Sequence, residues 1–141
     1  MQTPSFRRLN ADWNADPNAP YPEVREIGSR LELRFHLDSL THNAKFGEVG
    51  CLAFENCSAW RLGYPNMDGW YFGHWRYKKL APEWGEFYEL VGEDALRMEA
   101  DDWRKPTEAG AGDRHFLFYL RDETFECLAG GWKFDPNTGW A

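Results

Sequence analysis

Residues 114–129, Arg-His-Phe-Leu-Phe-Tyr-Leu-Arg-Asp-Glu-Thr-Phe-Glu-Cys-Leu-Ala, form the most regular pattern in the sequence. Two runs of aromatic and aliphatic residues flank Asp122-Glu123, and such a pair between apolar runs predicts a short β-hairpin turn. Phe116 and Phe118 share one face of the first run, whereas His115 and Leu117 share the other. Apolar residues on both faces are typical of a strand that is covered on each side. We therefore expect this hairpin to lie at the centre of the core.

A second hairpin is predicted from residues 24–27 and 31–37, which flank the turn-forming pair Gly28-Ser29. In its second arm Leu31, Leu33 and Phe35 alternate with charged residues, as in a half-buried strand. Further strands are expected within residues 6–9, 47–62, 70–77, 84–91 and 132–134.

Residues 94–103 predict one helix. Leu96, Ala100 and Trp103 recur at i, i+4 and i+7 on one helical face, and Asp94 is a suitable N-cap. Strands joined by short turns indicate antiparallel pairing. The sequence thus predicts a mostly β (α+β) fold, an antiparallel curved sheet, half-barrel or sandwich, with one packed helix.

We expect residues 1–141 to form a single domain. Residues 1–21 are rich in Pro, Asn and Asp and predict an irregular N-terminal arm, with Trp13 and Tyr21 pinning it to the body.

The bulk properties exclude several classes of function. The net charge of −7 argues against nucleic-acid binding, which needs clustered Lys and Arg, but permits a basic protein partner. No apolar run approaches the about 18 residues of a membrane span, and the N-terminus lacks the apolar region of a signal peptide. Three cysteines without a Cys-x-x-Cys spacing make a disulfide framework improbable. A reducing cytoplasm is the expected location.

Two segments resemble a family of small bacterial proteins of unknown function. Residues 57–66, Cys-Ser-Ala-Trp-Arg-Leu-Gly-Tyr-Pro-Asn, are similar to a family signature R-x-G-x-P-N-D-E, and residues 115–129 to a signature H-F-x-F-x-F-H-D-x-T-F-E-C-x-A. Met67-Asp68 stands where the family has Asp-Glu, and Arg121 stands where it has His. The resemblance covers roughly residues 47–134 and implies a fold without implying an activity.

Glu126, His115 and Cys127 are the candidates for chemistry. Glu126 lies between Phe125 and Cys127, so a pocket around it would raise its pKa and make it an acid or base. The structural alternative is that Glu126 faces water or pairs with Arg61 or Arg114. Cys127 would need a base such as His115 to act as a nucleophile, and strand cysteines are more often small buried hydrophobes.

Cofactor and metal motifs are missing. The histidines and cysteines show no ligand pair at a recognised spacing, and we expect no metal and no cofactor.

A loop and the aromatic strand after it form the stronger binding candidate. They combine rigid aromatic area with hydrogen-bonding groups, as interaction hot spots do. The residues are Arg61, Tyr64, Asn66, Asp68, Trp70, Tyr71, His74 and Trp75. The alternative is that these aromatic residues fill the core.

The leading hypothesis is a non-enzymatic cytoplasmic protein-binding module, in its most concrete form an immunity-type protein that neutralises a bacterial toxin. It rests on small size, acidity, aromatic loops and the absence of catalytic motifs. The alternative is a small-ligand-binding half-barrel, enzymatic or not, with a pocket lined by His115, Glu126 and Arg61. The sequence leaves the oligomeric state open.

Overall fold

The described residues of the computed structural model form nine antiparallel strands. The structure describes residues 4–39, 48–63, 85–92, 102–104 and 113–136. The strands are β1 (Ser5–Arg8), β2 (Glu23–Ile27), β3 (Arg30–His36), β4 (Val49–Glu55), β5 (Ala59–Gly63), β6 (Phe87–Val91), β7 (Arg114–Tyr119), β8 (Thr124–Ala129) and β9 (Gly131–Pro136).

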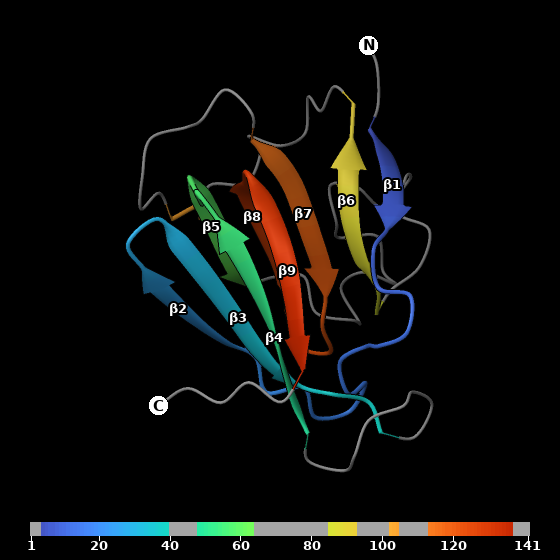
Figure 1. Cartoon of the computed structure of the whole chain (residues 1–141). Helices are drawn as coiled ribbons and strands as arrows, with labels where there is room; N and C mark the ends of the chain where they lie inside the picture. Colours follow the sequence, from blue (N-terminus) through green and yellow to red (C-terminus); the bar gives the residue numbers. More distant parts are fainter. Residues whose placement is uncertain (1–3, 40–47, 64–84, 93–101, 105–112, 137–141) are drawn as a thin grey trace.

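The strands form two sheets that face each other (Figure 1). One sheet has five strands in the order β1-β6-β7-β8-β5, and the other has four in the order β2-β3-β4-β9. Aromatic side chains of the two sheets meet between them, for instance Phe35 with Phe118 and Phe54 with Phe116. The architecture is therefore a sandwich, one of the three arrangements that the sequence allowed.

The predicted central hairpin is confirmed. Strands β7 and β8 pair with Phe118 opposite Phe125 and Phe116 opposite Cys127. They occupy inner positions of the five-stranded sheet, and every residue of β8 is buried. The β2–β3 hairpin is confirmed as well, with Gly28 at φ +60°, a conformation that glycine adopts without strain.

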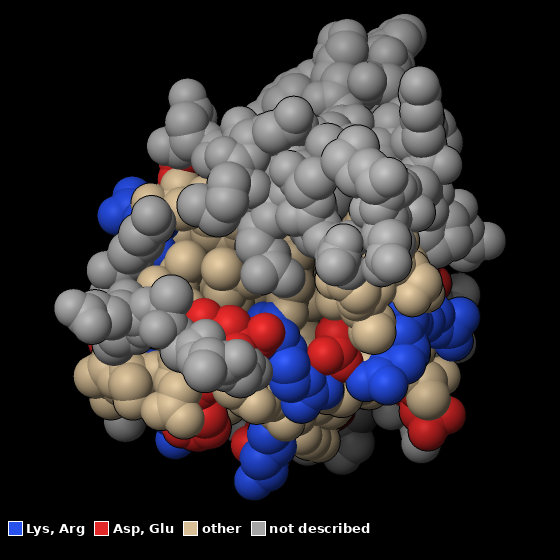
Figure 2. All heavy atoms as spheres, turned by 90° about the horizontal axis from the view of Figure 1, so that it is seen from above, with Lys and Arg blue, Asp and Glu red and all other residues tan. Residues whose placement is uncertain are grey.

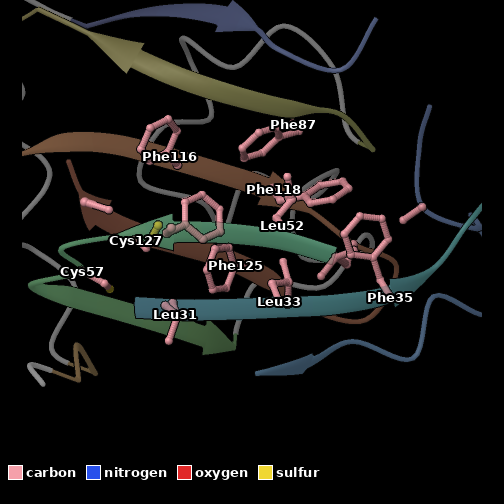
Figure 3. Close-up of a cluster of buried hydrophobic side chains, with 14 of the residues drawn as sticks. Leu31, Leu33, Phe35, Leu52, Cys57, Phe87, Phe116, Phe118, Phe125 and Cys127 are labelled. Carbon is pink, nitrogen blue, oxygen red and sulfur yellow. The ribbon is translucent and has the colours of Figure 1, made fainter. Parts of the chain in front are cut away.

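The hydrophobic core fills the space between the sheets (Figure 3). The alternating residues Leu31, Leu33 and Phe35 point into it from β3, as predicted, and each is at most 1% exposed. From β7 and β8 the inward residues include Phe118 and Cys127, also fully buried. Burying large aromatic side chains is the main favourable contribution to the stability of such a small domain.

The turn between β4 and β5 carries the chain from one sheet to the other. Strand β4 pairs with β3 and β9, whereas β5 pairs with β8. Asn56 lies in this turn at φ +53°, and the Cys57 N–H donates a 2.8 Å hydrogen bond to the Ser29 carbonyl. The two strands predicted within residues 47–62 therefore exist but are not hydrogen-bonded to each other.

The predicted packed helix is wrong, because the described part of the chain is all β and contains no helix. Most of the predicted span, residues 94–101, lies outside the described residues. Its described end, residues 102 and 103, is not helical, and the next residue, Arg104, forms a two-hydrogen-bond bridge with Trp60 of β5, at 2.8 and 2.7 Å. Three apolar residues at helical spacing are a weak signal, and backbone pairing to a sheet edge overrides it here.

The N-terminal arm combines the expected short strand β1 with an irregular segment. The Trp13 ring stacks on Phe134 with centroids 4.1 Å apart, and it also contacts Phe87 and Phe118 of the other sheet. Trp13 therefore pins the arm between the two sheets, as predicted. Tyr21 is 68% exposed, and its ring contacts the body only at the edge of the His36 ring of β3 among the described residues, with centroids 5.4 Å apart.

Charges of both signs alternate at the end of the sandwich that faces the viewer in Figure 2. At one edge the guanidinium groups of Arg7 and Arg114 enclose the Glu89 carboxylate. Arg114 binds it with two hydrogen bonds of 2.8 and 2.9 Å. These contacts join β1, β6 and β7 and, despite burial, lower the pKa of Glu89, with the Arg114 hydrogen bond as the largest cause.

Replacing Glu89 should change how stability depends on pH. Because the folded pKa of Glu89 lies below the unfolded one, its contribution is present above about pH 4.3 and is lost as the pH falls through the folded pKa. We expect Glu89→Gln to cost about 1–2 kcal/mol at pH 7 and progressively less in acid. Urea unfolding between pH 7 and pH 3 measures this. The exposed Glu26→Gln should stay within about 0.5 kcal/mol throughout, and a deficit in Glu89→Gln as large at pH 3 as at pH 7 would contradict the ion-pair explanation.

Candidate functional site

A cluster of polar side chains is buried on the outer face of the five-stranded sheet, opposite the core. Arg61 of β5 and Glu126 of β8 are direct cross-strand neighbours, and the Arg61 Nη1 donates a 2.9 Å hydrogen bond to Glu126 Oε1. His115 of β7 lies diagonally across, with Nε2 at 2.7 Å from Glu126 Oε2. Glu126 and His115 are 0% exposed and Arg61 is 5% exposed. The alternation along three adjacent strands brings the three side chains together.

Residues 102–104 lie against this cluster. The Asp102 carboxylate accepts hydrogen bonds from Arg61 Nε at 2.6 Å and from Nη2 at 3.0 Å, a bidentate pair. The Trp103 ring meets His115 edge-on, with centroids 6.1 Å apart. The Arg104 guanidinium lies 5.2 Å from the centre of the Trp60 ring. These contacts fasten the segment to the edge strand β5.

Arg61 is the central charged group of the cluster, because its guanidinium binds both Glu126 and Asp102. Burial alone would lower the pKa of Arg61, but the hydrogen bond to Asp102 and the charges of Glu126 and Asp102 outweigh it and raise the pKa. Arg61 therefore stays charged. In its ionised form Glu126 can only accept hydrogen bonds, and in that form its partner atom, His115 Nε2, is the donor.

The arrangement places a carboxylate against an imidazole, which is how proteins fix the tautomer of a catalytic histidine. Here both groups are inaccessible to solvent and satisfy each other. Polar side chains that are removed from water need hydrogen-bond partners, and the side chains of this cluster are partners of one another. We assign the cluster to the stability and register of the sheet, so the structural alternative for Glu126, pairing with Arg61, is the one that the structure bears out.

The structure separates one of the three residues predicted for a pocket from the other two. His115 and Glu126 meet, but Cys127 points into the core from the opposite face of β8. Of the predicted binding set, Arg61 lies in the buried cluster. The remaining members lie outside the described residues: Tyr64, Asn66, Asp68, Trp70, Tyr71, His74 and Trp75.

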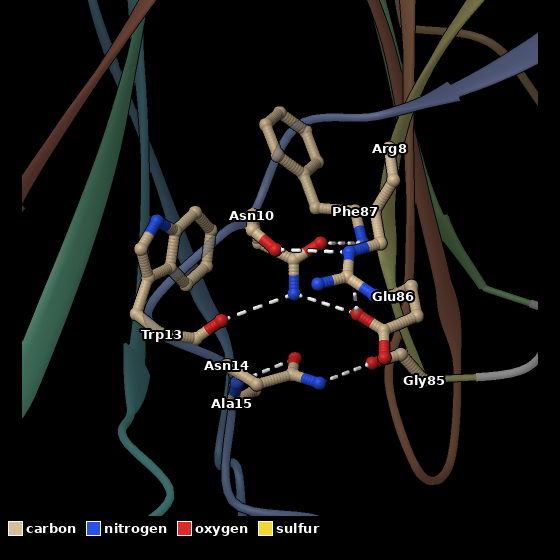
Figure 4. Close-up of polar contacts among 8 residues, drawn as sticks. All are labelled: Arg8, Asn10, Trp13, Asn14, Ala15, Gly85, Glu86 and Phe87. Atoms are coloured by element: carbon tan, nitrogen blue, oxygen red, sulfur yellow. Dashed lines mark hydrogen bonds and ion pairs between the residues drawn. The ribbon is translucent and has the colours of Figure 1, made fainter. Parts of the chain in front are cut away.

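A second polar region lies along the N-terminal arm, which Asn10 holds in place (Figure 4). The Asn10 side chain donates to the Trp13 carbonyl at 3.0 Å and to Glu86 Oε2 at 2.7 Å, and it accepts from the Phe87 N–H at 3.1 Å. Asn14 donates to the Gly85 carbonyl at 2.6 Å. The contacts with Glu86 and Gly85 have no signature in the sequence, because the partners are more than 70 positions apart and asparagines in an irregular segment are typical of turns.

The arm and the turn between β7 and β8 enclose two adjoining clefts, which we call together the arm–turn groove. The inner cleft, of about 290 Å³, is lined by Asn14, Asp16, Asp38, Glu86, Tyr119 and Arg121 among others. The outer cleft, also of about 290 Å³, is lined by Asn18, Pro20, Tyr21, Glu23, Asp122 and Glu123 among others. A 2.9 Å hydrogen bond from Arg121 to the Asn18 carbonyl marks the junction between the two clefts.

Three carboxylates line the outer cleft, of which Glu23 and Asp122 are exposed and Glu123 is half-buried. None of the ion pairs formed by the described residues involves Glu23, Asp122 or Glu123. Burial and, secondarily, the neighbouring Asp122 raise the pKa of Glu123. The cleft therefore favours a positively charged occupant, which would relieve this repulsion.

Metal binding and membrane insertion find no support in the described part of the chain. No group of three or more His, Cys, Asp or Glu side chains is placed there to hold a metal ion. None of its elements is a helix long and apolar enough to cross a membrane.

Comparisons with known proteins give no relative. No protein-family model matches the sequence, and neither a curated protein nor a solved structure is significantly similar to it. The resemblance of residues 57–66 and 115–129 to small bacterial proteins stays a prediction.

Disrupting the buried cluster should be costly. In Glu126→Gln, Arg61 keeps Asp102 but loses its fully buried counter-charge, and we expect a loss of about 2–3 kcal/mol in the free energy of unfolding. Glu55→Gln is the control, because the Glu55 side chain is 63% exposed and its pair with Arg30 should contribute less than about 0.5 kcal/mol. Urea unfolding measures both variants. Equal losses in the two would show that Glu126 has no special role.

Coupling within the cluster can be measured directly. Arg61→Leu and Glu126→Leu should each destabilise the protein, and the double variant should cost less than the sum because neither charge is then left alone. Strict additivity would contradict a direct Arg61–Glu126 interaction.

Proposed function

We propose that the chain is a non-enzymatic binding protein that holds a basic segment of another protein in the arm–turn groove. The observation that carries the proposal is the outer cleft, which Glu23, Asp122 and Glu123 line together with the exposed Tyr21, and in which these carboxylates form no ion pair with another described residue. Groups of like charge in one cleft reduce stability unless a ligand of opposite charge binds there.

The side chains around the cleft suit a lysine or arginine. Carboxylates supply the charge, and the exposed face of Tyr21 offers a cation–π contact and apolar area for the aliphatic stem. Pro20 and Pro22 flank Tyr21 and restrict the backbone on either side. A restricted backbone loses less conformational entropy on binding, which favours affinity.

The net negative charge of the chain also favours a basic protein partner. A net charge of −7 accelerates the approach of a basic protein and disfavours nucleic acids. An immunity-type protein that neutralises a toxin in the cytoplasm is the specific form of this function that we favour, on the acidity and size of the chain. The buried Arg61–Glu126–His115 cluster then serves as part of the scaffold, and no catalytic step is assigned to it.

Neutralising the groove should weaken binding of a basic peptide more than neutralising the same charge elsewhere. The probe is a lysine- and arginine-rich peptide of about ten residues, with a glutamate-rich peptide of the same length as the negative control. We expect the triple variant Glu23→Gln, Asp122→Asn, Glu123→Gln to lose at least about tenfold in affinity, because it removes the carboxylates that face the bound cation. Isothermal titration calorimetry at low and physiological salt measures the affinity.

The matched control is the triple variant Glu26→Gln, Glu55→Gln, Asp135→Asn, which removes an equal charge from the four-stranded sheet. It should lose less than about threefold, by weakened long-range attraction alone. Equal losses in both triple variants, or no binding of the basic peptide to the unaltered protein, would refute the groove as the site.

A further inference from the structure

Strand β9 forms one edge of the four-stranded sheet. It pairs with β4 on one side, and among the described residues no strand pairs with its other side. No backbone hydrogen bond from another described segment reaches Trp132 or Phe134 there. All six residues of β9 are half-buried or exposed. An unpaired edge presents a row of N–H and C=O groups to which another strand can add.

The register shows which backbone groups of β9 point to this open side. The Leu37 N–H donates to the Glu48 carbonyl at 2.9 Å, and these two residues continue the register of β3 with β4. Hydrogen-bonded pairs alternate along an antiparallel ladder. Leu52 therefore directs its N–H and C=O to β3, and its neighbour Ala53 directs them to β9, where Lys133 is the partner.

The residues on either side of Lys133 have the opposite orientation. Trp132 and Phe134 direct their N–H and C=O groups to the open side, and so does Pro136 with its carbonyl, since proline has no N–H. The side chains of Trp132 and Phe134 pack against the core. Those of Lys133 and Asp135 lie on the outer face and are 73% and 39% exposed. The edge thus combines outward-directed hydrogen-bonding groups, aromatic area and two opposite charges.

We propose that β9 is a self-association edge, to which a second copy of this chain adds its own β9 in antiparallel orientation about a two-fold axis at Phe134. In this register each Phe134 N–H donates to the Phe134 carbonyl of the other copy, and each Trp132 N–H donates to the Pro136 carbonyl. Pro136 lies at the end of the paired segment, where its missing N–H removes only the outermost bond. The two four-stranded sheets then form one continuous sheet.

The charges of β9 select this register. With the axis at Phe134, Lys133 lies opposite Asp135 of the second copy, at a position without backbone hydrogen bonds, where facing side chains come closest. An axis at Lys133 or at Asp135 would instead set two like charges opposite each other, which destabilises a strand pair. Within one chain the two side chains already share a face, with Nζ and Oδ1 3.6 Å apart. The edge is therefore complementary to itself.

The other sheet edges fit a second copy less well. The charges of β1 are both positive, Arg7 and Arg8, so two copies of β1 have no opposite charges to pair. Strand β5 is already bridged by Arg104. Strand β2 has charges of both signs but no aromatic residue, and its cation Arg25 is shared with Glu32 of β3.

The expected association depends on concentration. Six residues on each side make a small contact compared with the about 1,200 Å² at which specific, stable interfaces begin. The net charge of −7 on each chain also opposes the approach of a second copy. Physiological salt screens that repulsion beyond about 8 Å, whereas Lys133 and Asp135 act in direct contact. The dimer should therefore form at high micromolar to millimolar chain concentration. This inference does not depend on the arm–turn groove.

Sedimentation equilibrium of the full chain in physiological salt, from low micromolar to millimolar concentration, tests the proposal. We expect a monomer–dimer equilibrium in the unaltered protein. Lys133→Glu and Asp135→Lys should each weaken it at least about tenfold, because each sets like charges opposite each other on both sides of the axis. An equimolar mixture of the two variants should associate again, since every facing pair then has opposite charges. The double variant should also associate.

The matched control is Glu26→Lys in β2, an exposed residue whose replacement changes the net charge as Asp135→Lys does. Because it lowers the negative charge of each chain, it should not weaken the dimer. Circular dichroism melting verifies that each variant is folded. Amide hydrogen exchange locates the interface: the Trp132 and Phe134 amides should gain protection as concentration rises, whereas the Lys133 amide, which faces β4, is protected throughout.

A chain that stays monomeric over the whole concentration range overturns the proposal, and Lys133 and Pro136 then protect the edge against pairing. Association that survives in both single variants also overturns it. So does a rise in protection at other amides without one at Trp132 and Phe134, because the interface then lies on another surface. Binding of the basic peptide in the arm–turn groove is measured separately, so the two proposals can fail independently.

Discussion

Strand β8 is buried on both faces, and this constraint shapes the described structure around it. Its inward residues Phe125 and Cys127 pack into the aromatic core. Its outward residue Glu126 is equally inaccessible, and a buried carboxylate is tolerated only with strong partners. Arg61 and His115 must therefore occupy the facing positions of β5 and β7, so one charged residue helps fix the register of three strands. A shift of one residue would place Glu126 in the core and Phe125 among the polar groups.

The sequence predicted those strands and turns that are determined by residues close together in the chain. The alternation of Leu31, Leu33 and Phe35 indicated a half-buried strand, and Gly28 indicated the turn before it. The assignment of strands to sheets is not local, so the passage from β4 to β5 across the sandwich had no signature in the sequence. The helix prediction failed at its end for a similar reason, because the pairing of Arg104 with Trp60 joins positions 44 apart.

The candidate sites also differ in how far the sequence could predict them. The sequence suggested that Glu126 pairs with an arginine, either Arg61 or Arg114. Only the register of the strands in the fold shows that the partner is Arg61. Arg114 instead binds Glu89, on the other face of the same sheet. The arm–turn groove could not be foreseen, because residues 14–23 and 119–123 are about a hundred positions apart and come together only in the fold, where Arg121 donates to the Asn18 carbonyl.

The contrast between the two acidic environments supports a binding function for the groove. Every buried carboxylate of the sheets whose contacts are described has arginine partners: Glu89 has two, Glu32 has Arg25 and Arg30, and Glu126 has Arg61. The carboxylates of the outer cleft differ from these: Glu23 and Asp122 are exposed, Glu123 is half-buried, and none of the three forms an ion pair with another described residue. Trp13 and Asn10 fix the arm, and the hydrogen bond from Arg121 to the Asn18 carbonyl joins the arm to the β7–β8 turn that carries Asp122 and Glu123. Repulsion that is held in place by a rigid frame is a cost to the unbound protein, and it is recovered when a cation binds.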